Sequence, residues 1–512
     1  MRTFFKTVAI VTVFSVAEKI LGFLYRIFLS QSIGEEGIGL YQVALSVFGL
    51  LYTACCSGTP VTVSRLITKH RSENNLIKAE KVISAGLSLT LATAIPVCLV
   101  FIFFGKGFTF LFADPRCYKV FLIILPGLIF TSVYSVLRGV FWGYKDFLPY
   151  SIIELLEEIC MICCGIFLIN RATSVYQGAV RAGVAVLISY VFSFTLSIIV
   201  FVARKNKLRN PISELKPLIL SSAPVTAMRT ANSLAVSLVS VILPIRLVAS
   251  GMSSNEAMTV FGAACGQALP ILFIPTTLIG SFTLVLIPEI AENYYKKQYF
   301  YLKRDIEKAI KLATCLTTLF IPVFFVCGEE IGVLVFKSVN CGKYLSVSAF
   351  LMLFMSLSNL STSMLNSIGL EHKTLSFYIV GGGLMLISVW FLPSMVGIYA
   401  LLIGFSFVYG LTSVLNLRLL NKNCPLKPKY LRLVLGSALT VIPTAILGLM
   451  LEKMLLPVLG TFFNFAVCSA IMMIFNCLLF FGFSLVEFKS LSKKIKGVLK
   501  KSPLKKTIEK TA

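Results

Sequence analysis

The chain has 512 residues, of which 57% are hydrophobic and 13% charged, and its net charge is +25. Because soluble domains carry about 25% charged residues, this composition excludes an ordinary soluble protein and predicts a polytopic membrane protein. A basic excess would suggest nucleic-acid binding in a soluble protein. Here Lys and Arg fall at the ends of apolar runs, where they set topology and meet anionic lipid, so we expect no nucleic-acid partner.

Apolar runs in chain order predict about fourteen transmembrane helices, since one crossing takes roughly 20 residues. The fold class is therefore an all-α polytopic membrane protein. The first run holds charges and no small-x-small cleavage pattern follows it, so we expect it to stay as the first crossing. The predicted helices are 4–33, 38–66, 81–104, 116–137, 150–170, 179–203, 217–249, 256–291, 308–328, 342–366, 374–395, 397–419, 431–452 and 459–486.

Charge alternates between successive loops. Loops rich in Lys and Arg, such as 65–81 and 204–216, alternate with poor ones, the first of which is 34–37. The positive-inside rule then places both termini in the cytoplasm and predicts a multi-pass protein of the plasma (inner) membrane. The basic tail, 487–512, fits either an amphipathic helix on the anionic inner leaflet or a disordered basic segment.

Cysteine and histidine usage gives no sign of a metal or redox site. Most of the 14 cysteines lie inside apolar runs and are interpreted as packing residues. His70 and His372 fall in separate predicted cytoplasmic loops. The chain also has no Gly-x-x-x-x-Gly-Lys-Ser/Thr loop for a nucleotide. We expect no cofactor and no metal.

The first apolar run carries a polar stripe, formed by Ser15, Lys19, Gly22 and Arg26 at i, i+4, i+7 and i+11. A charge at mid-bilayer costs about 2.5–3.5 kcal/mol, so the stripe predicts a face toward a wet cavity or a partner. The alternative is that Lys19 and Arg26 reach the two membrane surfaces while Glu18 pairs with Lys19.

The seventh apolar run carries a similar polar stripe, formed by Thr226, Arg229, Ser233, Ser237 and Ser240. Hydroxyls that pack helices together explain the serines but not Arg229, about three turns into the membrane. If the two halves of the chain face each other, Lys19, Arg26 and Arg229 converge on a cationic cavity. Such a cavity suits an anion with many acceptor oxygens, such as a diphosphate lipid head group.

An acidic cluster in the fifth run, Glu154, Glu157 and Glu158, is the best catalytic-looking group. A cation-coupling site, or ion pairs across the cavity, explains it at least as well. The predicted outer loops hold no long segment with carboxylates or histidines, which argues against a polyprenyl-linked sugar transferase or polymerase. We predict that the chain is not an enzyme.

A weak internal repeat suggests two halves. Pro60 and Lys69 recur as Pro288 and Lys297, at a shift of 228 positions. Two six-helix lobes in parallel orientation would produce such a repeat, although chance would too. The predicted organisation is an N-terminal lobe 1–210, a C-terminal lobe 211–425, two further transmembrane helices in 426–486, and the basic cytoplasmic tail 487–512.

An ordered set of motifs resembles the stage V sporulation protein B group within the polysaccharide-transporter family. This family belongs to the multidrug/oligosaccharidyl-lipid/polysaccharide flippase superfamily and is related to MurJ-type lipid II flippases. The resemblance covers most of the chain and is strongest over its first 300 residues. It rests on Lys19-x-x-Gly22-x-x-x-Arg26, Gly37-Ile38-Gly39-Leu40-Tyr41-Gln42, Ser57-Gly58-Thr59-Pro60, Leu137-Arg138-Gly139, Leu243-Pro244-x-Arg246, Ala268-Leu269-Pro270 and Ile287-Pro288-Glu289-Ile290.

The resemblance implies a fourteen-helix MATE/MurJ-like fold with two lobes around a cationic cavity. Lys19, Arg26 and Arg229 match basic positions of the family pattern, and Arg246 is counted with them as substrate-binding. Glu157 matches an acidic position, and with Glu18 it is interpreted as a coupling or ion-pair residue. The chain departs from the pattern at Trp142, where relatives often have Gln, and at Met161, where an Arg is expected.

The function that the resemblance implies is an alternating-access flippase. Its substrate would be an undecaprenyl-pyrophosphate-linked saccharide, lipid II or a similar cell-wall or spore-cortex precursor. The expected partners are this lipid-linked oligosaccharide, anionic membrane lipids and cell-wall synthases. The rival interpretation is a cation-coupled multidrug exporter of the same superfamily, which should show acidic cavity residues.

Overall fold

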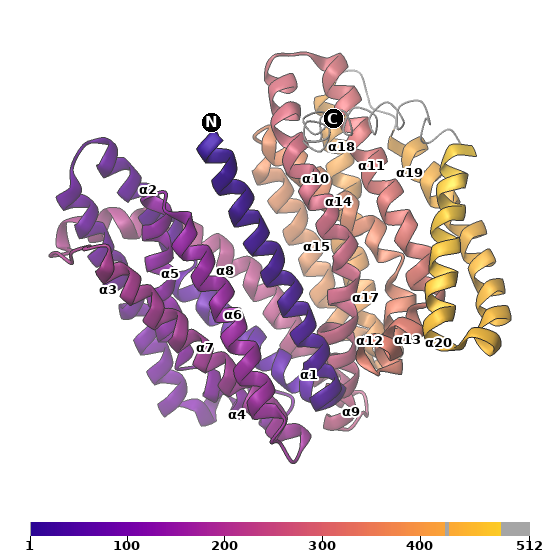
Figure 1. The fold of residues 1–512 in the computed structure, drawn as a ribbon, viewed down its shortest axis with the longest axis horizontal. Helices are drawn as coiled ribbons and strands as arrows, with labels where there is room; N and C mark the ends of the chain where they lie inside the picture. The colour runs from indigo at the N-terminus through magenta and orange to yellow at the C-terminus, as the bar shows by residue number, and fades with distance from the viewer. Residues whose placement is uncertain (1, 425–429, 483–512) are drawn as a thin grey trace, which may run out of the picture. The chain divides into compact units, whose positions relative to one another are not determined.

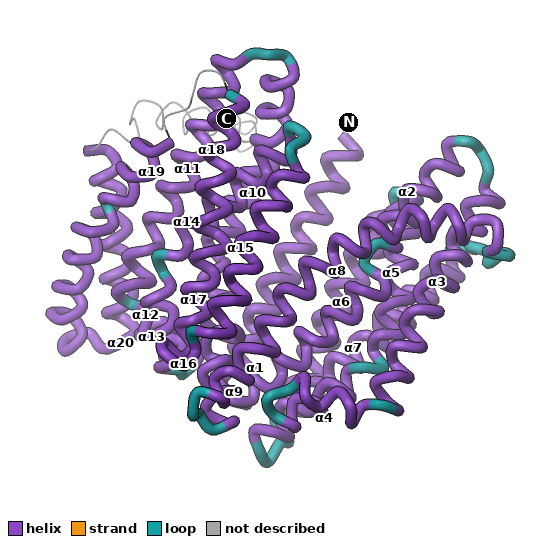
Figure 2. Tube along the Cα trace, turned by 180° about the vertical axis from the view of Figure 1, so that it is seen from behind, coloured by secondary structure: helices purple, strands orange, loops and turns teal. Residues whose placement is uncertain are grey.

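The computed structural model describes residues 2–424 and 430–482, and helices account for all the regular secondary structure in these ranges (Figures 1 and 2). The contacts between residues divide the chain into two units. Unit 1 comprises residues 1–270 and 386–401, and unit 2 comprises 271–385 and 402–512. The lobe boundaries predicted from the sequence stay a prediction. The predicted amphipathic tail lies outside the described residues.

Unit 1 consists of long helices joined by short loops. Its last two short elements come from a distant part of the chain. The elements are α1 (Arg2–Cys56), α2 (Thr59–Ser72), α3 (Leu76–Phe103), the 3₁₀ helix η1 (Gly105–Leu111), α4 (Pro115–Ile124), α5 (Gly127–Gly143), α6 (Phe147–Ile169), α7 (Val175–Ala203), α8 (Ile212–Ala249), α9 (Ser254–Phe261), the π-helix η2 (Gly262–Ala268), α16 (Pro393–Val396) and the 3₁₀ helix η3 (Gly397–Tyr399).

Unit 2 contains most of the remaining helices; α10, α15 and α17 cross its boundaries with unit 1. The elements are α10 (Leu269–Tyr295), α11 (Tyr299–Val326), α12 (Gly328–Phe336), α13 (Val339–Ser348), α14 (Leu351–Ser367), α15 (Glu371–Phe391), α17 (Ala400–Phe405), the π-helix η4 (Ser406–Leu411), α18 (Thr412–Asn423), α19 (Tyr430–Leu439) and α20 (Val441–Gly482). Its core packs Ile310 of α11 against Met364 of α14 and Leu420 of α18. Asn476 of α20 is fully buried and donates from Nδ2 to the Thr318 carbonyl of α11 at 3.1 Å.

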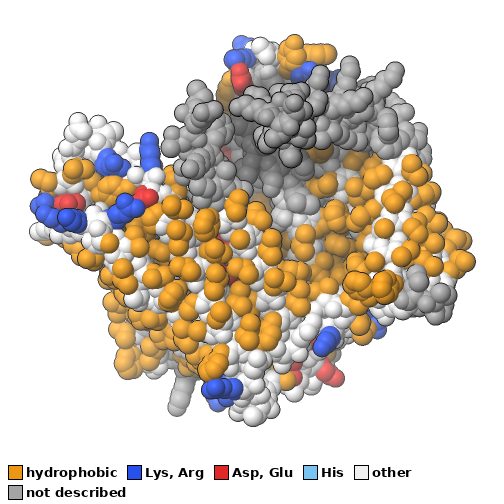
Figure 3. All heavy atoms as spheres, in the orientation of Figure 1, with side chains coloured by type: hydrophobic (Ala, Val, Ile, Leu, Met, Phe, Trp, Pro, Cys, Tyr) orange, Lys and Arg blue, Asp and Glu red, His pale blue; other side chains and the backbone are white. Residues whose placement is uncertain are grey.

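Ten of the described helical stretches are long and apolar enough to cross a membrane, and twelve are if each of two bent pairs is one span. This count takes Val13–Ser72 as one span and leaves out α6. Dividing the first span into two and adding α6 would give the predicted fourteen transmembrane helices. That number stays a prediction. Side chains such as Phe103 and Val202, 75% and 64% exposed, suit a lipid-facing surface. In Figure 3 a broad apolar band covers unit 1 below a cluster of Lys and Arg at its α2–α3 end.

Gly34 breaks α1 where the sequence predicts the first outer loop. Its φ of 67° lies in the left-handed region, which glycine adopts far more readily than other residues. The helix resumes at once, so the predicted loop 34–37 is almost entirely helical. The second predicted helix, 38–66, is in turn broken at Ser57 and Gly58, between α1 and α2.

Several glycines, three of them in the quoted motifs, mark places where helix backbones nearly touch. A Cβ on Gly39 of α1 would lie 2.2 Å from the Met258 carbonyl oxygen of α9, and one on Gly262 would lie 1.9 Å from the Glu35 oxygen. Gly58 is crowded in the same way by Thr226 of α8, and Gly139 of α5 by the Pro60 backbone. These glycines therefore hold α1, α2, α5, α8 and α9 at close range, which fixes the polar residues that the same helices carry.

Candidate functional site

Lys19 and Arg26 lie on α1 in different settings. Lys19 is exposed and makes no ion pair in the described part of the chain. Arg26 is half-buried, and its Nη1 donates to the Gly266 carbonyl oxygen of η2 at 2.9 Å. One residue on, Gln267 Nε2 donates to the Ser30 hydroxyl at 2.7 Å. The π-helical turn of η2 is thus tied to the polar face of α1. Such turns are frequent at functional sites.

Arg229 of α8 meets the break between α1 and α2. Its side chain is exposed, and Nη1 donates to the Ser57 carbonyl oxygen at 2.8 Å. The Gly58 amide in turn donates to the Thr226 hydroxyl at 3.2 Å. Two polar stripe residues of α8 are therefore bound to the Ser-Gly-Thr-Pro motif. A carbonyl contact leaves the positive charge of Arg229 uncompensated.

Arg246 lies apart from the other basic residues. It is in the last turn of α8, where Nε donates to the Trp390 carbonyl oxygen at 2.8 Å and the guanidinium stacks on the Trp390 ring, 5.1 Å from its centroid. At a rise of about 1.5 Å per residue, Arg246 and Arg229 are roughly 25 Å apart along the helix. One diphosphate cannot contact both at the same time.

Carboxylates of α1 and α6 gather around one arginine of α5. Glu154 of α6 accepts from Arg138 Nη1 at 3.2 Å, and Glu18 of α1 is close enough to interact with both. Glu158 is also near Glu18, and its Oε1 would be 3.0 Å from a Cβ on Gly22. A side chain at Gly22 of the Lys19-x-x-Gly22 motif would therefore crowd the Glu158 carboxylate. Within the same helix, Glu157 contacts the Ser193 hydroxyl of α7.

The structure thus brings together some predicted site residues and separates others. Glu18 and Glu157 belong to one acidic cluster, and Lys19 follows Glu18 in the chain. Arg26, Arg229 and Arg246 are instead each bound to a different backbone carbonyl.

Arg138 is the main residue that the sequence analysis missed as a site residue. The predicted fourth helix ended at 137, which left Arg138 in a basic loop. That placement is wrong, because α5 continues to Gly143 and the arginine lies inside it. Gly139 and Gly143, four residues apart, pack against α2 and are the sequence signal that could have extended the helix. Trp142, which departs from the family pattern, contacts the same arginine: the Arg138 guanidinium lies 5.2 Å from its ring centroid.

A second charged network joins α1, α4 and α9 at the other end of unit 1. Arg116 of α4 donates from Nη1 to Glu36 at 2.7 Å, from Nη2 to Asp114 at 2.6 Å and to Asn255 at 2.7 Å. Asp114 caps α4 and also accepts from the Ser254 hydroxyl at 2.9 Å. Burial alone would raise the pKa of the Asp114 carboxyl. The hydrogen bonds from Arg116 and Ser254 outweigh this effect and lower that pKa below its ordinary value.

His70 is also placed differently from its prediction. It lies in the last turn of α2 and not in a loop, because α2 runs to Ser72. The ring is buried between two carboxylates, with Nδ1 3.2 Å from Glu73 and Nε2 3.4 Å from Glu214 at the start of α8. Among the described residues, no group of three or more His, Cys, Asp or Glu side chains is arranged to hold a metal ion.

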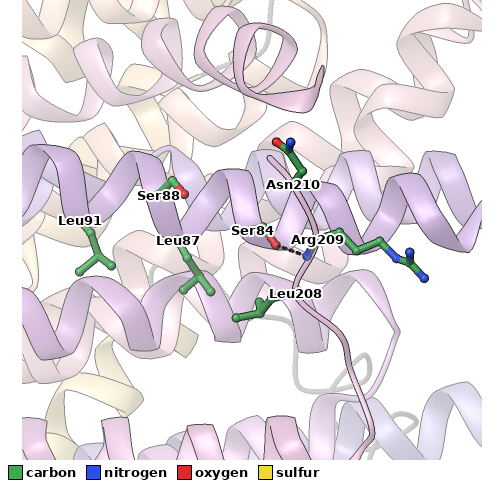
Figure 4. Close-up of a pocket in the computed structure, with 7 residues that line it drawn as sticks. All are labelled: Ser84, Leu87, Ser88, Leu91, Leu208, Arg209 and Asn210. Carbon is green, nitrogen blue, oxygen red and sulfur yellow. Dashed lines mark hydrogen bonds between the residues drawn. The ribbon is translucent and has the colours of Figure 1, made fainter. Parts of the chain in front are cut away.

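A pocket of about 420 Å³ lies between α3 and the linker that precedes α8. Figure 4 shows Leu208 directed toward Leu87 of α3, and the Arg209 amide donating to the Ser84 hydroxyl at 2.8 Å. None of the predicted site residues lines this pocket. Its lining is Ser84, Leu87, Ser88, Leu91, Leu208, Arg209 and Asn210.

The fold is shared with solved flippases and transporters of the multidrug/oligosaccharidyl-lipid/polysaccharide superfamily. One similar solved structure is the lipid II flippase MurJ in an inward closed conformation, with a TM-score of 0.70 and 14% identity over 94% of this chain and 99% of that one. Another is an inward-facing multidrug resistance MATE family transporter of the same superfamily, with a TM-score of 0.62 and 16% identity over 78% and 92% of the two chains.

Residues 4–294 match the family described as "Polysaccharide biosynthesis protein", and the chain belongs to this family. Among curated relatives, stage V sporulation protein B of Bacillus subtilis (strain 168) is 24% identical over 68% of this chain and 70% of its own length. Lipid II flippase MurJ of the same organism is 24% identical over 62% of each chain. The names of the MurJ proteins and of the MATE protein describe flipping and transport, in agreement with the prediction that the chain is not an enzyme.

Proposed function

We propose that the chain is an alternating-access flippase that moves an undecaprenyl-pyrophosphate-linked saccharide from the inner to the outer leaflet. The substrate is lipid II or a similar cell-wall or spore-cortex precursor. The proposal places the protein in the plasma membrane with both termini in the cytoplasm. Cell-wall synthases then receive the substrate, and anionic lipids meet the basic inner surface.

The observation that carries this proposal is a pair of exposed cations on apolar helices. Lys19 and Arg229 are exposed on helices long enough to span a membrane, and neither forms an ion pair within the described residues. Such charges are expensive in lipid and mark a substrate or ion path. Their sign suits a diphosphate, which Arg binds in a bidentate manner and Lys attracts as a compact charge. In this proposal Arg26 supports the same face, and Arg246 contacts the substrate only at the outer end.

A cation-coupled multidrug exporter is the second candidate, and the acidic cluster favours it. Glu18, Glu154 and Glu157 lie around a single arginine and Glu158 lies beside Glu18, which is the acidic polarity that a cation exporter needs. For the flippase, the same cluster provides a coupling site at Glu18 and Glu157. An exporter should remove a cationic fluorescent dye from cells, whereas a flippase should leave the dye content unchanged.

The test follows the sidedness of lipid II in cells depleted of their own flippase. An external enzyme that cleaves only outward-facing lipid II reports the fraction that has crossed. We expect the chain to restore this fraction and Arg229→Ala to reduce it by about tenfold or more, since a hydrogen bond to a charged group contributes about 1.5–3 kcal/mol.

Arg204→Ala is the matched control, because Arg204 pairs with Asp146 in an exposed loop outside the apolar helices. It should flip as well as the wild type. If the correctly inserted wild type restores no outward lipid II, the lipid II assignment is wrong. If Arg229→Ala flips normally, the cationic path through α8 is wrong.

A further inference from the structure

Arg138 is an arginine with spare hydrogen-bonding capacity in the half of unit 1 that carries the basic loops. Its side chain is 24% exposed, and one contact of 3.2 Å joins it to Glu154. Nε is buried and has no hydrogen-bond partner. A guanidinium has five N–H donors in a planar fork, so most of this capacity is unused. An unmet donor is costly in a buried setting, and a movement of the guanidinium toward a ligand would give this nitrogen an acceptor.

The Glu154 contact is weak for a charge-assisted pair. Such bonds usually measure about 2.7–2.9 Å, and the stable ones are often bidentate. The Arg138 contact is longer and involves a single nitrogen. It also competes with unfavourable neighbours, since Glu18 and Glu157 lie close to Glu154 and share the same arginine. An anion with several acceptor oxygens can offer Arg138 more and shorter bonds than Glu154 does, against the repulsion that Glu18, Glu154 and Glu157 exert on it.

The position of Arg138 suits the first contact with a lipid diphosphate. Arg138 is five residues before the end of α5, or about 7–8 Å along the helix. Glu154 is at a similar depth, seven residues into α6. The charge pattern assigns this end of both helices to the cytoplasm. The phosphates of a lipid in the inner leaflet lie at that surface, with Arg138 just below them.

We propose that Arg138 is an anion-binding residue for the diphosphate of the lipid-linked substrate and that Glu154 occupies it in the absence of substrate. The inference rests on the proposed function and adds a residue to its binding site. Substrate binding moves the guanidinium from Glu154 to the phosphate oxygens. Trp142, on which the guanidinium stacks, then changes its surroundings.

The chain provides its own probe, because Trp142 is one of only two tryptophans. Trp390→Phe removes the other while keeping an aromatic ring for Arg246. Purified full-length Trp390→Phe protein in nanodiscs is titrated with undecaprenyl pyrophosphate. Trp142 fluorescence is followed in parallel with binding of the radiolabelled lipid. We expect a saturable change in fluorescence with the same midpoint as binding.

Two substitutions separate a binding role from a structural one. Arg138→Gln should weaken binding at least tenfold and abolish the fluorescence change, and Arg138→Lys should recover part of the affinity. Glu154→Gln should tighten binding several-fold, because it removes the competitor while the amide keeps the shape. In the double variant this tightening should disappear. A purely structural pair would instead weaken binding in both single variants.

The outcomes distinguish this inference from the proposed function. Undecaprenyl pyrophosphate that binds with unchanged Trp142 fluorescence, or with full affinity in folded Arg138→Gln, overturns the role of Arg138 and leaves the flippase intact. Folded wild type that binds no undecaprenyl pyrophosphate overturns both. Arg204→Gln, at the same end of unit 1, should bind like the wild type.

Discussion

Two arginines of unit 1 are held in opposite ways. Arg116 contacts Glu36, Asp114 and Asn255 from α1, α4 and α9 at 2.6–2.7 Å, and its Nε adds further contacts to Asp114. Arg138 has one contact of 3.2 Å and a buried nitrogen without a partner. An arginine whose N–H donors all have acceptors links structural elements, whereas one with unused donors keeps them for a ligand. The comparison predicts that the first stabilises the fold and the second serves binding.

Removing Arg116 should have the largest effect on stability. Arg116→Ala leaves the Asp114 carboxylate, which is only 4% exposed, without its main partner. Breaking a buried pair costs about 3–5 kcal/mol, and we expect roughly 3 kcal/mol because Arg116 is partly exposed. The free energy of unfolding in micelles, measured by SDS titration, checks this. Arg204→Ala, which breaks an exposed pair, should lose less than about 1 kcal/mol. If both variants lose the same free energy of unfolding, Arg116 stabilises the fold no more than an exposed ion pair does.

The close packing beside Arg116 gives the next largest effect. Gly262→Ala places a Cβ 1.9 Å from the backbone carbonyl oxygen of Glu35, so the backbones of α1 and η2 must separate. Overpacking of this kind costs typically 1–3 kcal/mol. Gly49→Ala in α1 is the control, because a Cβ at this residue would have no neighbouring atom within 4 Å. It should be neutral or stabilising by up to about 1 kcal/mol. If the two variants unfold alike, the tight contact between these helices is wrong.

A pair of isosteric substitutions tests the comparison directly. Asp114→Asn should destabilise by about 1–3 kcal/mol, because it weakens hydrogen bonds from charged and neutral donors to a buried acceptor. Glu154→Gln should stay within about 1 kcal/mol of the wild type, since it loses one long contact and relieves repulsion from Glu18 and Glu157. The same SDS titration measures both. A larger loss for Glu154→Gln would mean that Arg138 is a structural residue as well.

The helices were predictable because a membrane leaves an apolar run of about 20 residues little choice but to be helical. The residues at which the helices begin and end were less predictable. The ninth predicted helix begins at 308, whereas α11 begins at Tyr299, and the basic residues that mark the membrane edge continue the helix beyond it. Arg138 was missed for the same reason. Charge shows where the membrane surface lies but not where a helix stops.

The polar stripes predicted Lys19, Arg26 and Arg229 as site candidates, but not what they contact. Arg26 and Arg229 bind backbone carbonyls at a π-helical turn and a helix break. Those groups depend on local backbone geometry and carry no side-chain signature. The Arg116 network was equally hidden, because Glu36 and Asn255 are far from it in the sequence.

Acid should weaken the Arg116 network in the wild-type protein. In Asp114→Asn the contribution of this residue to stability should not depend on pH. Because the pKa of Asp114 is lowered in the folded protein, the unfolded chain takes up its proton first as the pH falls. The stabilisation is therefore complete above the ordinary Asp pKa of about 3.9 and is lost as the pH drops through the lower folded value. Measured from pH 6 to pH 3, the unfolding midpoints of wild type and Asp114→Asn should differ by a constant amount above about pH 4 and begin to converge below it. A difference between the two proteins that stays constant over this range would show that Asp114 stabilises the network without its charge.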